Sequence, residues 1–280
     1  MFDSEEVQKD IEFNEKTNLR QLVASKCFGF WTDICGFGSL LEKNDWSLQK
    51  MNDNHVIELQ RSFYNIMGAI HGTEERTLIL NDGIAKILKY SDYVTINSDT
   101  ILFYIRDLLI SHYIFWKRAS KFGVSVRSVF AAGEYIPYAV NNQTGEKILQ
   151  YDPNNISKRG KQILNTTYVY NPTEFQMNTA FAKAFSIESQ GKKAGIKNDY
   201  FYIESSAVEL VNSIPNIDFV INHNVLTMAL DTIPRMELQI SNILLLNIKG
   251  LDIRVYEISS FHILKELDGD DIITRLGVYE

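Results

Sequence analysis

The stretch Phe28–Leu41, FGFWTDICGFGSLL, places a carboxylate at the end of an apolar run, with glycines directly after it. Its apolar residues predict a short buried strand with Asp33 at or near its end, and they are Phe28, Phe30, Trp31 and Ile34. The glycines allow the backbone to turn tightly there. Since a buried charge must be paired or bind a metal, Asp33 is a candidate metal ligand. The alternative is that Asp33 caps a helix that begins near Ser39.

The composition of the whole chain is that of a globular protein. Its 280 residues, 45% of them hydrophobic, can bury a sizeable core, so we expect one compact domain with modest additions. A net charge of −7 and a pI near 5.4 argue against DNA or RNA as the main partner. A small polyanion bound through metal ions is compatible with this charge.

Location and cysteine usage follow from local composition. No apolar run approaches the roughly 18 residues of a membrane span. Met1–Arg20 is too charged for a secretory signal, so a cytoplasmic protein is expected.

Cys27 and Cys35 lie too close together for a disulfide framework, and neither has His or Cys companions at the spacing of a zinc site. We therefore predict two reduced core thiols.

Periodicity predicts the elements that follow the first strand. Helical spacing is found over 53–69 and 98–122, and an apolar strand over 124–134. Between the helices, the arms of Arg76–Tyr90 flank Asn-Asp-Gly, a strong hairpin signal with Asp82 at its tip. This aspartate by itself is typical of a routine turn. The order strand, helix, hairpin, helix, strand predicts an α+β, ferredoxin-like fold with an antiparallel sheet.

Two of these segments resemble the class III nucleotidyl cyclases. The nine residues from Thr32 to Leu40, TDICGFGSL, are similar to the family's signature strand and turn, and the hairpin is similar to its Gly-Asp-Gly turn, with Asn81 replacing the first glycine. The resemblance implies a palm-type cyclase core in which Asp33, the Ile34 carbonyl and Asp82 bind two Mn²⁺ or Mg²⁺ ions. It also implies a triphosphate-binding turn made of Ile34, Cys35, Gly36, Phe37 and Gly38. Two cations can activate an attacking hydroxyl and neutralise phosphate charge.

A second pattern resembles the bacterial cyclases of anti-phage Pycsar systems, which make cyclic pyrimidine nucleotides. Arg127, Gly133 and Glu134 match their Arg-Gly-Gly-x-x-x-Gly-Glu strand, although Ser128 and Val129 replace two glycines. A later helix over 178–196 matches at Ala180, Ala184, Phe185, Ile187, Glu188 and Ser189. The resemblance implies cyclic UMP or cyclic CMP as the product, a homodimer, and an effector that senses the product.

The chain departs from better-known cyclases at the positions that stabilise the transition state. Ala182 and Ser186 stand where that family has Asn and Arg, and Leu78 lies near the position of its base-recognition lysine. Charge stabilisation must then come from elsewhere, and Arg127 and Lys183 are the candidates for catalytic cations. Arg127 could equally pair with an acidic neighbour, and Lys183 could simply lie on the solvent-exposed face of its helix.

These interpretations give a complete expectation for the chain. We expect a polar leader over 1–24, a cyclase-like catalytic domain over 25–204 and an extension over 205–280 packed on the same domain. A strand over 199–203 and a helix or strand pair over 237–255 would close it. The expected activity is a metal-dependent nucleotide cyclase. The alternatives are an adenylate or guanylate cyclase, a catalytically inactive nucleotide sensor with the same fold, and a nucleotide-free dimerisation module.

Overall fold

The computed structural model describes residues 24–69, 75–90, 98–136, 158, 161, 173–230, 233–264 and 272–275. The chain divides into two compact units, one of Met1–Ser25 with Tyr135–Asn178 and one of Lys26–Glu134 with Thr179–Glu280. In the first unit, the described residues form the short helix α8 (Thr173–Gln176) and a β-bridge between Tyr135 and Asn178. The expected leader lies almost entirely outside the described residues. Among those residues, no helix is long and apolar enough to cross a membrane.

The first half of the second unit contains the predicted strand, helix, hairpin, helix and strand. The elements are β1 (Ser25–Cys35), α2 (Phe37–Lys43), α3 (Leu48–Asp53), α4 (Val56–Met67), β2 (Glu75–Leu80), β3 (Gly83–Lys89), α5 (Ser98–Ala119) and β4 (Ser125–Tyr135). Their strands lie in the order β2-β3-β1-β4, and β3 is antiparallel to both β1 and β2. This is the strand order of a ferredoxin-like fold, so the predicted fold class is confirmed.

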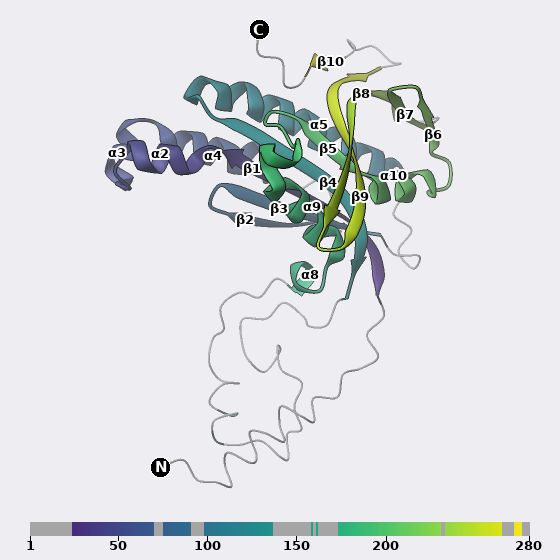
Figure 1. The fold of residues 1–280 in the computed structure, drawn as a ribbon, viewed down its shortest axis with the longest axis horizontal. Helices are drawn as coiled ribbons and strands as arrows, with labels where there is room; N and C mark the ends of the chain where they lie inside the picture. The colour runs from purple at the N-terminus through teal and green to yellow at the C-terminus, as the bar shows by residue number, and fades with distance from the viewer. Residues whose placement is uncertain are drawn as a thin grey trace. The chain divides into compact units, whose positions relative to one another are not determined.

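The second half extends the same sheet. It contains α9 (Thr179–Gln190), β5 (Phe201–Glu204), α10 (Ser205–Asn212), β6 (Asp218–Asn222), β7 (Val225–Leu230), β8 (Ile233–Ile248), β9 (Leu251–Ile263) and β10 (Ile272–Arg275). The order continues β4-β5-β9-β8-β7-β6, with β10 paired to β9. Figure 1 shows β8 and β9 as one long twisted hairpin. The strand-pair prediction for 237–255 is confirmed, and its helix alternative is wrong.

The two faces of β1 meet different helices. Phe28, Phe30 and Ile34 belong to the buried core that also contains Phe63 of α4 and Leu109 of α5. On the opposite face Trp31 contacts two aromatic rings of α9, with centroid distances of 6.0 and 5.2 Å. Because side chains alternate along a strand, Asp33 lies on the same face as Trp31, toward α9.

Two predicted helices have different limits in the structure. The predicted helix over 53–69 corresponds to α4 and is shorter than predicted, because Asp53 is the last residue of a separate helix, α3, whose N-cap Ser47 accepts a hydrogen bond from the Lys50 amide at 3.3 Å. The next helix then begins after His55, whose φ is +60°. The predicted helix over 178–196 ends at Gln190, and a 3₁₀ turn follows at Gly191–Ala194, where Gly191 has φ of +59°.

Candidate active site

The β2–β3 hairpin brings its tip to the end of β1. Asp33 and Gly83 are cross-strand partners, and the Ile34 amide donates a 2.9 Å hydrogen bond to the Asp82 carbonyl. Asn81 begins the turn with φ of +47°. Such a conformation is tolerated best by Asn, Asp and Gly. The two aspartates predicted as metal ligands are therefore brought together at one end of the sheet.

Helix α4 anchors this turn. The Gln60 amide nitrogen donates to the Asn81 side-chain oxygen at 2.9 Å, and the Tyr64 hydroxyl donates to the Asn81 carbonyl at 2.9 Å. Gly83 is required on the opposite side, because a Cβ there would lie 2.4 Å from the Trp31 ring. The hydrogen bonds of Asn81 and the missing Cβ of Gly83 thus fix the position of the hairpin tip, which carries Asp82.

Asp33 is a half-buried carboxylate that forms no ion pair with any residue that the structure describes. Among the described residues, no side chain or amide donates a hydrogen bond to it. Burial raises the pKa of Asp33 to about 7, Glu188 and Asp82 add to the rise, and Arg127 opposes it. The helix-cap alternative is wrong, because the N-cap of α2 is Gly36 and no side chain caps that helix. A poorly solvated carboxylate with no partner is a favourable position for a cation.

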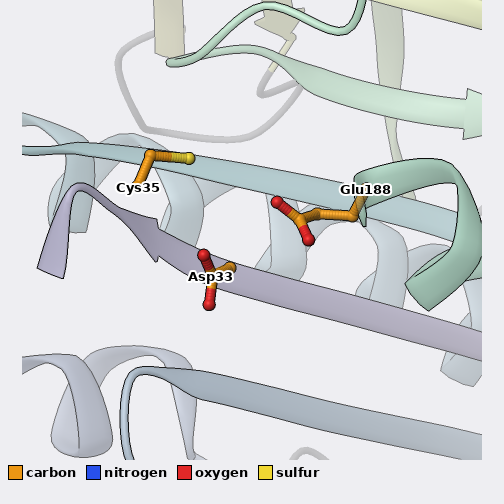
Figure 2. A group of neighbouring side chains, drawn as sticks. All are labelled: Asp33, Cys35 and Glu188. Carbon is orange, nitrogen blue, oxygen red and sulfur yellow. The ribbon is translucent and has the colours of Figure 1, made fainter. Parts of the chain in front are cut away.

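A cluster of three possible ligands surrounds this position. One ligand atom each from Asp33, Cys35 and Glu188 lies within 4.8 Å of the other two, and Figure 2 shows Glu188 extending from α9 toward Asp33 of β1. Burial raises the pKa of Cys35 to about 12, so this group is a neutral thiol. Neither cysteine forms a disulfide, and Cys27 is a buried core thiol as predicted, whereas Cys35 is only partly buried and belongs to the cluster.

Glu188 is the residue that sequence reasoning missed as part of the site. The only signal for it was its match to the Pycsar helix pattern, which gave it no role. Its position beside Asp33 depends on the packing of α9 over β1, which is tight enough that a Cβ on Gly29 would lie 2.6 Å from the Ala180 carbonyl carbon. No local pattern in the sequence specifies this packing.

Arg127 lies on β4 and is paired with Glu188. Its Nε donates to Glu188 Oε1 at 2.8 Å, and its Nη2 donates to the same oxygen. Its Nη1 donates to the Ile196 carbonyl at 3.3 Å and to Asn198 Oδ1 at 3.2 Å. The acidic-neighbour alternative therefore describes this structure, and a phosphate-binding role for Arg127 stays a prediction.

Lys183 lies elsewhere on α9. Its ammonium donates to the Ala132 carbonyl at 2.9 Å and to the Ser206 hydroxyl at 2.8 Å, and Glu204 is 3.5 Å away. The side chain is 21% exposed, so it is not simply a solvated residue of the helix surface. It is not a member of the Asp33 cluster, and its catalytic role also stays a prediction.

A buried polar chain lies on the other face of the sheet. His112 is fully buried, with Nδ1 2.8 Å from the Ser128 hydroxyl and Nε2 3.5 Å from the Asp199 carbonyl. A carbonyl only accepts, so Nε2 carries the proton and the Ser128 hydroxyl donates to Nδ1. The Thr32 hydroxyl then donates to Ser128 at 2.8 Å. His112 is thus a core histidine with both ring nitrogens hydrogen-bonded, and the hydrogen bond between Thr32 and Ser128 links β1 to β4.

The donor set fits a hard divalent cation. Carboxylate and carbonyl oxygens are the ligands that Mg²⁺ and Mn²⁺ prefer, and Asp33, Asp82 and the Ile34 carbonyl supply them at one strand end. Next along the chain, Gly36 has φ of +94° and precedes the first turn of α2. Amides in the first turn of a helix have no intrahelical acceptor, so they can meet an anion.

Comparison with known proteins gives structural likenesses only. The chain matches no family model and no curated protein sequence. It is similar to the guanylyl cyclase Cya2 (11% identity, TM-score 0.47, covering 88% of this chain and 96% of that one). It is also similar to the adenylyl cyclase CyaB from P. aeruginosa (12%, 0.42, 85% and 96%) and to the guanylate cyclase domain of RhGC from Catenaria anguillulae (13%, 0.44, 87% and 100%). These TM-scores are all below 0.5, so the fold assignment rests on the strand order of the chain and not on these similarities.

Proposed function

We propose that this protein is a metal-dependent nucleotide cyclase that converts a nucleoside triphosphate into a 3′,5′-cyclic nucleotide and diphosphate. The observation that carries the proposal is the Asp33 carboxylate, which accepts no hydrogen bond from the residues that the structure describes. The hydrogen bond from the Ile34 amide to the Asp82 carbonyl holds the turn that carries Asp82 next to it. Two carboxylates at such a position would hold two divalent cations, which lower the pKa of an attacking hydroxyl and neutralise phosphate charge.

The residues of the chain have separate roles in this proposal. Asp33, Asp82 and the Ile34 carbonyl are the ligands of Mn²⁺ or Mg²⁺. Within the turn Ile34–Gly38, the amides that follow Ile34 would take the triphosphate, because the Ile34 amide already donates to the Asp82 carbonyl. In the reaction the 3′-oxygen bonds to the α-phosphorus, the bond from that phosphorus to the bridging oxygen breaks, diphosphate leaves, and the hydroxyl proton passes to solvent. Arg127 and Lys183 remain the candidate donors to the transferring phosphoryl group.

The proposed substrate and setting follow from the Pycsar resemblance. We expect UTP or CTP as substrate, a homodimer as the active form, and an effector protein that responds to the cyclic product during phage infection. The main alternative within the enzyme class is an adenylate or guanylate cyclase.

An inactive nucleotide sensor is the second candidate. It is favoured by the engagement of both candidate cations, since Arg127 is held by Glu188 and Lys183 is held by Ala132 and Ser206. Such a protein would bind nucleotide and metal at the same position without turnover.

Product analysis separates these candidates. The purified protein is incubated with each of the four ribonucleoside triphosphates and Mn²⁺, and the products are separated by chromatography. Cyclic UMP or cyclic CMP is the expected product, and Asp33→Asn and Asp82→Asn should each abolish it. Saturable nucleotide binding with no product from any substrate, including in extract of phage-infected cells, would favour the sensor. An Asp82→Asn variant with near-normal turnover at limiting Mn²⁺ would contradict the metal assignment.

A further inference from the structure

The buried ion pair of Arg127 and Glu188 lies directly beside Asp33. Arg127 is 9% exposed and Glu188 is 6% exposed. The pair joins β4 to α9, and Figure 2 shows the Glu188 carboxylate extending from α9 toward Asp33. Both charges act on the Asp33 carboxylate, since Glu188 raises the pKa of Asp33 and Arg127 lowers it.

The guanidinium is fixed in orientation by its partners. A guanidinium has five N–H donors. Nε and Nη2 each give one to Glu188 Oε1, and Nη1 gives its two to the Ile196 carbonyl and Asn198 Oδ1. Four donors are thus used, and one N–H of Nη2 has no acceptor among the described residues. Glu188 receives two of the four, so it is the main anchor of Arg127.

Without that anchor, Asp33 is a carboxylate that can compete for Arg127, because one of its oxygens lies within 4.8 Å of a Glu188 carboxylate oxygen. Arg127 already acts electrostatically on Asp33, and Asp33 has no other counter-ion among the described residues. Arginine and carboxylate pair readily through charge-assisted hydrogen bonds. A guanidinium released from Glu188 would therefore turn to Asp33 and occupy the carboxylate oxygens that a cation needs.

We infer that Glu188 is a positioning residue that holds the Arg127 guanidinium away from Asp33 and so leaves this carboxylate free to bind a divalent cation. The inference rests on the proposed function in one respect, namely that Asp33 is a metal ligand. Glu188 acts through Arg127 here and is not itself a ligand of the metal.

The test measures Mn²⁺ affinity without nucleotide at pH 8, from the electron paramagnetic resonance signal of free Mn²⁺. The proteins are the wild type, Glu188→Gln, Arg127→Met and the double variant, with Glu134→Gln as a control that neutralises an exposed carboxylate. Glu188→Gln should weaken Mn²⁺ binding by about tenfold, as expected for residues in direct contact. Arg127→Met should change the wild type little but should restore most of the affinity lost in Glu188→Gln.

The inference is tested by whether the effects of Glu188→Gln and Arg127→Met on Mn²⁺ affinity depend on each other. If Arg127→Met strengthens binding equally in both backgrounds, Glu188 acts only through its charge, and the inference is overturned. It is also overturned if the double variant binds as weakly as Glu188→Gln, which would make Glu188 a metal ligand, or if Glu188→Gln binds normally. Should Glu188→Gln fail to fold, Arg127→Met alone carries the test, since it should bind Mn²⁺ at least as tightly as the wild type, and weaker binding would refute the inference.

Failure of the proposed metal site has a different signature. In that case the wild type would show no saturable Mn²⁺ binding, or Asp33→Asn would bind as well as the wild type. Either result would remove the basis of the inference, whereas normal wild-type binding without coupling between positions 127 and 188 would leave the proposed function intact.

Discussion

Replacing Asp33 by Asn should stabilise the metal-free protein at neutral and alkaline pH. The pKa of Asp33 rises from 3.8 to about 7 in the fold. Three pKa units correspond to a cost on the order of 4 kcal/mol for the ionised carboxylate. Solvent access to this half-buried group lowers the expected gain to about 2–4 kcal/mol. Asparagine has nearly the same shape and carries no charge, so it removes this cost.

The gain should depend on pH in a specific direction. Because the folded-state pKa lies above the unfolded value, the folded protein binds the proton more tightly, and the cost of ionisation is complete only above about pH 7. The difference in unfolding free energy between Asp33→Asn and the wild type should therefore be largest at pH 8 and vanish as the pH falls toward 4. Urea unfolding with EDTA, followed by circular dichroism, measures this difference at each pH.

Metal should remove most of the difference in stability between the two proteins. Mn²⁺ binds only the folded wild type in this view, and a concentration of 100 times the dissociation constant would add about 2.7 kcal/mol to its stability. Asp33→Asn should gain much less. The matched control is Asp218→Asn, which neutralises an exposed strand aspartate and should change neither quantity. An Asp33→Asn variant that is less stable than the wild type at pH 8 without metal would refute the account of Asp33 as an uncompensated charge.

Three further predictions concern the scaffold. Gly29→Ala should cost about 1–3 kcal/mol of stability, because its Cβ would lie 2.6 Å from the α9 backbone, whereas Gly38→Ala, with nothing within 4 Å, should be neutral or stabilising in urea unfolding. Lys86→Met should cost about 3–5 kcal/mol, since it leaves Glu75 buried without the ammonium 2.6 Å away, and a Lys86→Met, Glu75→Leu double variant that recovered none of the loss would contradict this. Burial lowers the pKa of His112 from 6.5 to about 4, so stability contributed by its neutral form should be lost as the pH falls from 6.5 to 4, by up to about 3 kcal/mol, and His112→Gln should flatten that part of the pH profile.

The order of elements in the first half of the chain could be predicted because local patterns encode it. Helical periodicity predicted α5, and the prediction differs from the structure only in including the 3₁₀ turn at its end. Asn-Asp-Gly predicted the hairpin whose turn is Asn81–Asp82. Together these elements specify the ferredoxin-like sheet, because the hairpin and the two flanking strands have few other ways to pair. The same patterns placed Asp33 near a strand end and Asp82 in a turn, and the structure has both residues at these positions.

The limits of some elements could not be predicted because capping competes with periodicity. Apolar residues continue at helical spacing past Asp53, yet α3 ends there and α4 begins after His55. His55, the N-cap of α4, adopts a positive φ that no sequence pattern marks. Similarly, the spacing over 178–196 does not reveal that Gly191 ends the regular α-helix.

The sequence by itself determined the fold class and the two aspartates, since strands, helices and turns depend on residues that are close along the chain. Only the tertiary structure decided what surrounds Asp33. Arg127 and Glu188 are 61 positions apart, and Lys183 and Ala132 are 51 positions apart. Which cation meets which acceptor depends on how α9 packs across β1 and β4, and that packing is set by shape and burial over the whole sheet rather than by any local pattern.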